Sequence, residues 1–132
     1  MTRSFSTRAI HEGEGRDKTT GAHNTPIYQT ATFSFERAED FAAAIEIAVD
    51  PDRMNPLDNF FYSRTSNPTN AALEKKLASL ESAEGALVTS SGMSAVAISI
   101  MISAKSGDHV IVTNDLFVIS RQFFEQDCSA VG

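Results

Sequence analysis

The chain has 132 residues, a length typical of one domain, of which 42% are hydrophobic and 21% charged. Its net charge is -6, and this acidic balance argues against general binding to nucleic acids or to anionic membrane surfaces. A single cysteine, Cys128, excludes an intrachain disulfide and fits a reducing compartment such as the cytoplasm, and the most apolar run, residues 96–102, is too short to cross a bilayer.

The N-terminal region does not have the pattern of a packed domain. Residues 2–21 are polar and lack helical or strand periodicity, which predicts an extended arm or loop without a secretory signal. Residues 25–33 are rich in β-branched and aromatic residues, and Pro26 holds Thr25 in an extended conformation, so this segment is predicted to be strand-like. We expect such an arm to pack on another subunit.

A helix is predicted from Ser34 or Phe35. Acidic residues occupy its first turn, where they favour the helix dipole. Five apolar residues recur at helical spacing: Ala38, Phe41, Ala42, Ile45 and Val49. Two prolines within residues 51–59 predict a loop after this helix.

A second helix is predicted from Pro68 to about Leu80. Asn67 is a favoured N-cap, and Pro68 stands at the first helical position, where its missing N–H costs nothing. The predicted buried stripe consists of Leu73, Leu77 and Leu80. The residues predicted to face water are Glu74, Lys75, Lys76 and Glu81.

Tyr62 and Arg64 precede this helix and are candidate anion-binding residues. If the backbone is extended, side chains two residues apart point to the same side. A phenol and a guanidinium directed together suit phosphate oxygens. The alternative is a surface salt bridge beside a half-buried tyrosine.

Residues 86–95 have the pattern of a short buried strand, a tight turn and an apolar helix. The first N–H groups of a helix lack intrahelical partners, and the helix dipole adds partial positive charge there. Gly92 allows an anion to approach the backbone, and Ser90 and Ser91 can add hydroxyl groups. Ser90, Ser91 and Gly92 are therefore candidate phosphate-binding residues. The alternative is an ordinary connection in which Ser91 is a helix N-cap.

The C-terminal part predicts a second strand at residues 109–113 and a helix from Phe117 to about Asp127. Strands that alternate with helices predict parallel βαβ units of an α/β fold, in which ligands bind at the carboxyl ends of the strands. Residues 90–93 and 115–117 would lie side by side at that edge. Phe117 could then stack on a flat ligand, although simple helix packing is the alternative.

The chain resembles the N-terminal portion of the Cys/Met metabolism (transsulfuration) family of pyridoxal-phosphate enzymes, which includes cystathionine γ-synthases and γ-lyases, methionine γ-lyases and O-acylhomoserine sulfhydrylases. Six stretches in family order carry the resemblance: Thr7-Arg8-Ala9-Ile10-His11, Thr25-Pro26-Ile27-Tyr28-Gln29-Thr30, Tyr62-Ser63-Arg64-Thr65-Ser66-Asn67-Pro68-Thr69, Leu80-Glu81, Ser91-Gly92-Met93-Ser94-Ala95 and Gly107-Asp108-His109-Val110. The resemblance implies an N-terminal arm (residues 1–60) and the start of a fold-type I large domain (residues 61–132), left incomplete.

The resemblance also implies roles for the candidate residues. Gly92 and Met93 would donate backbone N–H groups to the phosphate of pyridoxal 5'-phosphate. Tyr62 and Arg64 would bind the same phosphate in the neighbouring subunit of a dimer or tetramer. Phe117 would stack on the pyridine ring. The arm would wrap the partner subunit, and the substrate would be a sulfur-containing or O-acylated amino acid.

Two departures from the family pattern limit this interpretation. Many members have tyrosine where this chain has Phe117, and phenylalanine cannot exchange a proton. The family's Schiff-base lysine stands in a Ser/Thr-rich motif, and none of the lysines here does: Lys18, Lys75, Lys76 and Lys105. We therefore expect no catalytic residue within these residues, no metal site, and no family reaction by this polypeptide alone.

Three functions stay open on the sequence. The first is the N-terminal part of a pyridoxal-phosphate enzyme that carries out γ- or β-elimination or replacement once a C-terminal chain completes it. The second is a non-catalytic fragment that associates with a full-length relative. The third is an unrelated phosphate-binding βαβ domain, although Gly-x-Gly-x-x-Gly and Walker motifs are missing.

Overall fold

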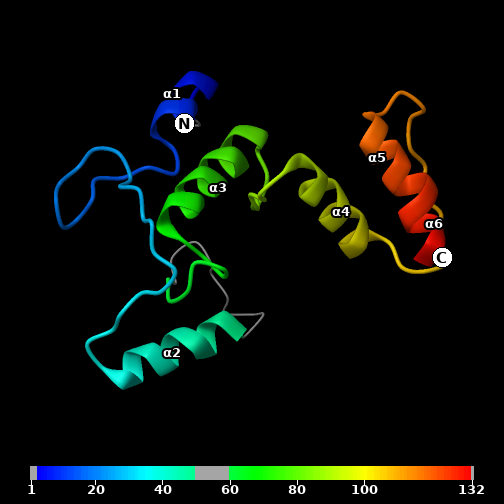
Figure 1. The fold of residues 1–132 in the computed structure, drawn as a ribbon. Coiled ribbons are helices and arrows are strands. Elements are labelled where there is room, and N and C mark those ends of the chain that lie inside the picture. The colour runs from blue at the N-terminus through cyan, green and yellow to red at the C-terminus, as the bar shows by residue number, and fades with distance from the viewer. Residues whose placement is uncertain (1–2, 50–59, 132) are drawn as a thin grey trace. The chain divides into compact units, whose positions relative to one another are not determined.

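The computed structural model describes residues 3–49 and 60–131, and these fall into two compact units, Met1–Val88 and Thr89–Gly132 (Figure 1). The described helices of the first unit are α1 (Phe5–His11), α2 (Ala38–Val49) and α3 (Pro68–Glu81). Those of the second are α4 (Gly92–Ser103), α5 (Val118–Gln122), a π-helical segment (Phe123–Cys128) and α6 (Ser129–Val131). The loop predicted at residues 51–59 lies outside the described residues.

Helix α1 corrects the prediction that residues 2–21 form an extended arm or loop. Ser4 is its N-cap, and the Ser4 side chain accepts a hydrogen bond from the Thr7 N–H at 3.3 Å. Gly13, one residue beyond the C-cap Glu12, adopts a φ of +74°, which favours glycine. Ser4 is a typical residue before a helix and Gly13 a typical residue after one, so both ends of α1 were marked in the sequence. The helix was missed because seven residues are too few to show a helical repeat of apolar side chains.

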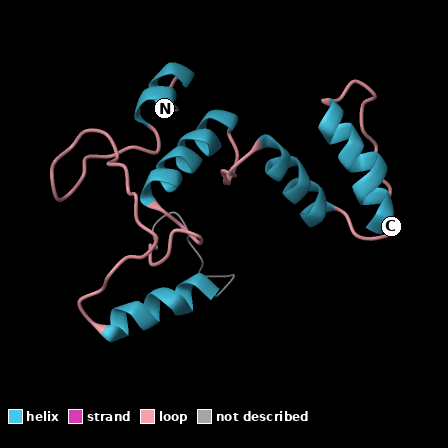
Figure 2. Cartoon of the chain, in the orientation of Figure 1, coloured by secondary structure: helices cyan, strands magenta, loops and turns pink. Residues whose placement is uncertain are grey.

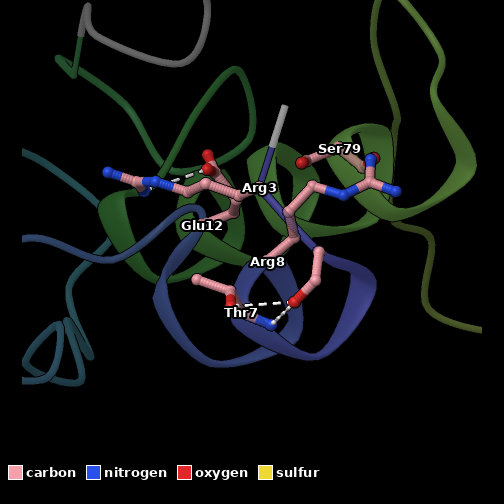
Figure 3. Close-up of polar contacts among 6 residues, drawn as sticks. Arg3, Thr7, Arg8, Glu12 and Ser79 are labelled. Atoms are coloured by element: carbon pink, nitrogen blue, oxygen red, sulfur yellow. Dashed lines mark hydrogen bonds and ion pairs between the residues drawn. The ribbon is translucent and has the colours of Figure 1, made fainter. Parts of the chain in front are cut away.

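Helix α1 and the turn after it pack on α3 within the first unit. Arg8 donates a hydrogen bond from Nη1 to the Ser79 carbonyl oxygen (Figure 3). Lys76 of α3 forms an ion pair with Glu14. Gly13 approaches α3 so closely that an added Cβ would lie 2.0 Å from the Ala72 carbonyl oxygen. Residues 5–14 are thus part of the same compact unit as α3.

The buried side of α3 differs from the predicted leucine stripe. Its buried residues are Ala71, Glu74 and Ala78, whereas Leu73 is 48% exposed. Glu74, predicted to face water, is only 8% exposed, and its Oε1 accepts a hydrogen bond from the Val88 N–H at 3.0 Å. Small alanine side chains permit close packing along this side, and the Val88 N–H donor satisfies the buried carboxylate.

Helix α2 begins at Ala38, later than the predicted Ser34 or Phe35. The Phe35 ring lies outside the helix and packs on the Phe41 ring, with 5.6 Å between the ring centroids. Contacts of this type, between a residue before a helix and one in its second turn, fix the direction of chain entry. Among the side chains of α2 that the structure describes, Ala44 is the buried one, and it is not a member of the predicted apolar stripe.

The strands predicted at residues 25–33, 86–89 and 109–113 are not formed in the described part of the chain, which Figure 2 draws as helices and loops. An isolated antiparallel bridge between Thr32 and Tyr62 is present instead. A strand exists only when a neighbouring strand pairs with its backbone groups, and parallel sheets need cover on both faces. The parallel pairing of the predicted βαβ units is therefore not confirmed in the described residues.

Helix α4 confirms the predicted apolar helix after the serine-glycine turn. Apolar side chains surround its axis, and Met101 and Ile102 are 74% and 79% exposed. Next to it lies an apolar groove of about 440 Å³ within the second unit, lined among others by Ile100, Met101, Val110, Val112, Phe123 and Phe124. Among the described helices, none combines the length and the hydropathy that a bilayer span requires.

Candidate functional site

The backbone around Tyr62 and Arg64 is a turn, not the extended segment that was predicted. The Tyr62 carbonyl oxygen accepts hydrogen bonds from the Thr65 N–H at 2.9 Å and from the Ser66 N–H at 3.1 Å. These bonds bring residues 62–66 into a compact turn directly before the N-cap of α3. The alternation of side chains along a strand therefore does not apply here.

Tyr62 and Arg64 nevertheless lie together. The Arg64 Cζ is 4.9 Å from the centroid of the Tyr62 ring, so the guanidinium stacks over the phenol ring. Tyr62 is half-buried and Arg64 is exposed. The juxtaposition predicted from the spacing is thus present, although a tight turn produces it. The alternative was a surface salt bridge beside a half-buried tyrosine. Tyr62 is half-buried, as this alternative predicts, but the partner of Arg64 in the described residues is an aromatic ring and not a carboxylate.

The start of α4 has the features of an anion site. Ser91 is the N-cap, and its Oγ accepts a hydrogen bond from the Ser94 N–H at 3.1 Å, as the alternative predicted. The N–H groups of Gly92 and Met93, at the first two helical positions, have no acceptor among the described residues. A Cβ added at Gly92 would meet no atom within 4 Å. These residues could hold a phosphate group, since two donors, the helix dipole and open space coincide.

Phe117 stands at the N-cap of α5 and is 65% exposed, so the simple packing alternative does not describe its environment in the second unit. One turn further along, Ser120 is buried and its Oγ donates a hydrogen bond to the Met93 Sδ at 3.3 Å. This contact holds the first turn of α5 against the first turn of α4. The exposed Phe117 ring therefore lies at the start of α5, and the N–H groups of Gly92 and Met93 lie at the start of α4, the two helix ends that this contact joins.

The candidate residues are divided between the two units. Tyr62 and Arg64 belong to the first unit, and Ser91, Gly92, Met93 and Phe117 belong to the second. Sequence reasoning missed Ser120, which links two of the helix ends, and Glu74, which fixes the Val88 backbone. Ser120 carried no signal beyond its helical spacing from Phe117, because a serine–thioether contact leaves no pattern in sequence.

The family model for the Cys/Met metabolism PLP-dependent enzymes matches residues 6–132. The chain belongs to this family. The cofactor of the family is pyridoxal phosphate, and its members act in sulfur amino-acid metabolism. The resemblance inferred from the six sequence stretches is thereby confirmed.

Individual relatives match the chain along nearly its whole length. A probable cystathionine gamma-synthase of Herpetosiphon aurantiacus is 37% identical over 126 residues, which are 96% of this chain and 34% of the relative. An L-methionine gamma-lyase of Porphyromonas gingivalis is 35% identical over 132 residues, all of this chain and 31% of the relative. The chain therefore spans about a third of the length of these relatives.

Solved structures of this family match the fold of the chain. The crystal structure of metB from Corynebacterium glutamicum aligns with a TM-score of 0.80 at 34% identity, covering 99% of this chain and 30% of that one. The cystathionine gamma-lyase from Lactobacillus plantarum, complexed with L-serine, aligns with a TM-score of 0.75 at 32% identity. The path of the backbone is thus that of a family member, even where strand pairing is lacking in the described residues.

Proposed function

We propose that this chain is the N-terminal part of a pyridoxal-phosphate enzyme that acts on a sulfur-containing or O-acylated amino acid by γ- or β-elimination or replacement. The observation that supports this most is the start of α4, where the N–H groups of Gly92 and Met93 lack acceptors among the described residues at an exposed turn. A phosphate dianion would satisfy both groups and gain from the helix dipole. Ser91 would cap the helix and limit the orientation of the turn.

Tyr62 and Arg64 are proposed to bind the phosphate of the cofactor in a neighbouring subunit of a dimer or tetramer. The guanidinium is exposed and stacks over the phenol ring, so both groups can be presented to one anion. A planar guanidinium offers several N–H donors to phosphate oxygens, and the phenol adds one more. Placement of this pair in a different unit from the α4 turn is compatible with a site shared between subunits.

Phe117 is proposed to stack on the pyridine ring, because its side chain is largely exposed beside the α4 turn. When bound, the cofactor supplies the electron withdrawal that weakens bonds of the amino-acid substrate. Phe117 has no hydroxyl group, so it can orient the ring but cannot move a proton. A residue other than Phe117 would have to carry out any proton transfer near this position.

The reaction is proposed to need polypeptide beyond these residues. Lys76, which lies on α3, forms an ion pair with Glu14, and this leaves the lysine unsuited to form a Schiff base. We therefore propose that residues 1–60 make inter-subunit contacts, that residues 61–132 begin the cofactor-binding domain, and that a C-terminal chain supplies the lysine. Association of an inactive chain with a full-length relative is tested by a further mixture of the chain with such a relative.

The first test titrates pyridoxal phosphate into the chain alone and into the chain mixed with a separately expressed polypeptide that matches the remaining two thirds of a family subunit. We expect visible absorbance of bound cofactor only in the mixture, since the proposed lysine comes from the second polypeptide. Arg64→Ala should weaken binding roughly 10- to 100-fold, because it removes a charge-assisted contact to phosphate. Arg37→Ala is the matched control, as Arg37 is an exposed arginine of the same unit.

Several results would oppose the proposal. Equal affinities of the Arg64→Ala and wild-type mixtures would remove Arg64 from the site. Binding of a mononucleotide by the chain alone, without binding of pyridoxal phosphate in the mixture, would favour the unrelated phosphate-binding domain. Association with a full-length relative that leaves its cofactor affinity unchanged would favour the non-catalytic fragment.

A second prediction concerns association. The exposed apolar residues of α4 and the neighbouring groove leave much hydrophobic surface in contact with water. We expect the isolated chain to self-associate or aggregate, and the complementing polypeptide to suppress this, as sedimentation velocity over a range of concentrations would show. A monomer at all concentrations with a sharp, cooperative thermal transition would contradict this expectation.

A further inference from the structure

We propose that Asn67 is a positioning residue for Tyr62 and Arg64, acting through a network that attaches the segment of residues 26–33 to the turn of residues 62–66. The inference rests on the proposed function, because it concerns how the phosphate-binding pair is held. Asn67 itself is only 7% exposed and is therefore not available to contact a ligand directly.

Asn67 uses both ends of its amide group. Its Oδ1 accepts a hydrogen bond from the Thr69 N–H at 2.9 Å, which is the N-cap contact expected from the sequence. Its Nδ2 donates to the Tyr28 carbonyl oxygen and to the Ser63 Oγ, each at 3.0 Å. The cap needs only the oxygen atom, so the two Nδ2 contacts have a separate effect.

Neighbouring contacts extend this attachment on both sides. The Thr69 Oγ1 accepts from the Tyr28 N–H at 2.9 Å and donates to the Pro26 carbonyl oxygen at 3.3 Å. Tyr28 is therefore held at its N–H by Thr69 and at its carbonyl oxygen by Asn67. We call these contacts, with those of Ser63, the Asn67 network.

Ser63 connects the network to the turn, because it lies between Tyr62 and Arg64. The Ser63 N–H donates to the Ala31 carbonyl oxygen at 2.8 Å, and its Oγ donates to the Thr30 carbonyl oxygen. Residue 63 is thus fixed through its backbone and through its side chain. Since Tyr62 and Arg64 flank it directly, the network limits the directions in which the phenol and the guanidinium point.

This arrangement matters for binding because an exposed arginine loses rotamer freedom when it binds an anion. Holding the backbone and stacking the guanidinium on Tyr62 reduces the entropy that binding must still remove. Arg64 has no carboxylate contact assigned in the described residues, so the turn and the ring are what orient it. Asn67 acts on this orientation without touching the phosphate.

The test uses Asn67→Asp, which keeps the Oδ1 acceptor for the helix cap and removes the two Nδ2 donors. We expect the upfield ring-current shift of the Arg64 side-chain protons over Tyr62 to fall by about half or more, while the α3 amide protons stay protected from exchange. Asn70→Asp is the matched control, since Asn70 is exposed on the same helix and acquires the same charge. Ser63→Ala leaves the cap intact and should reduce the shift in the same direction.

Other outcomes would overturn the inference. An unchanged Arg64 shift in Asn67→Asp and Ser63→Ala would mean that the network does not orient the pair. Loss of the shift together with loss of α3 protection would assign Asn67 to helix capping alone, and an equal effect of Asn70→Asp would assign the result to charge.

A second readout separates this inference from the proposed function. In the mixture with the complementing polypeptide, Asn67→Asp should weaken pyridoxal phosphate binding about tenfold, and it should have a smaller effect in an Arg64→Ala background, where only Tyr62 is still positioned. If Arg64→Ala itself has no effect, the proposed function fails. If Arg64→Ala weakens binding and Asn67→Asp does not, only the positioning role fails.

Discussion

Gly13→Ala should destabilise the first unit by about 3 kcal/mol, because the strain of a positive φ adds to a severe overlap. The added Cβ would lie 2.0 Å from the Ala72 carbonyl oxygen and 2.9 Å from the Lys76 nitrogen, both of which are backbone atoms of α3. Neither atom can move without deforming the helix. We expect urea denaturation followed by circular dichroism to report the loss, and hydrogen exchange to show early opening of α1.

Gly15→Ala provides the matched control for this prediction. Gly15 lies two residues away, and an added Cβ there would meet no atom within 4 Å. Its effect should stay within about 0.5 kcal/mol, the range of ordinary surface substitutions. Equal stability of the Gly13→Ala and Gly15→Ala chains, with α1 amides still protected, would show that α1 does not pack on α3 in this way.

Glu74→Leu is expected to produce the second large effect. The substitution removes the acceptor of the Val88 N–H, and an unpaired donor in a partly buried position costs about 1–2 kcal/mol. Glu74→Gln keeps an acceptor oxygen in the same place and should be close to neutral. The measurement is the free energy of unfolding together with the exchange rate of the Val88 amide proton, which should rise selectively in Glu74→Leu.

Glu81→Leu is the control for Glu74→Leu, because Glu81 is an exposed residue at the end of the same helix. The two substitutions change charge and side-chain volume alike, so a difference between them reports the buried contact. If both variants unfold alike and the Val88 amide keeps its protection, then the Glu74 carboxylate does not fix this backbone segment.

Local features of the sequence predicted those elements that depend on near neighbours. The N-cap of α3 at Asn67 with Pro68 at its first position, the N-cap Ser91 before α4, and the helical character after Phe117 are confirmed. Each depends on contacts within a few residues, where side-chain chemistry determines the backbone. The six ordered motifs identified the family for the same reason: they are patterns in the chain itself.

Errors arose where distant segments decide the outcome. Leucine periodicity predicted one face of α3 as buried, but the buried residues are Ala71, Glu74 and Ala78, and Glu74 accepts a hydrogen bond from the distant Val88 N–H. The predicted strands required pairing partners, and the described residues provide a single bridge, between Thr32 and Tyr62. No local pattern reports whether such a partner is present.

The sequence by itself determined the family, the caps and the residue types available for a phosphate group, because these are properties of short stretches. Only the tertiary structure decided that Tyr62 and Arg64 meet through a turn, that Ser120 joins Met93, and that the Asn67 network holds residues 26–33. These contacts join residues up to 43 positions apart, as in the bond between Thr69 and Pro26. Hydrogen bonds and steric fit across such separations arise when the chain folds, and they leave no periodic signal along it.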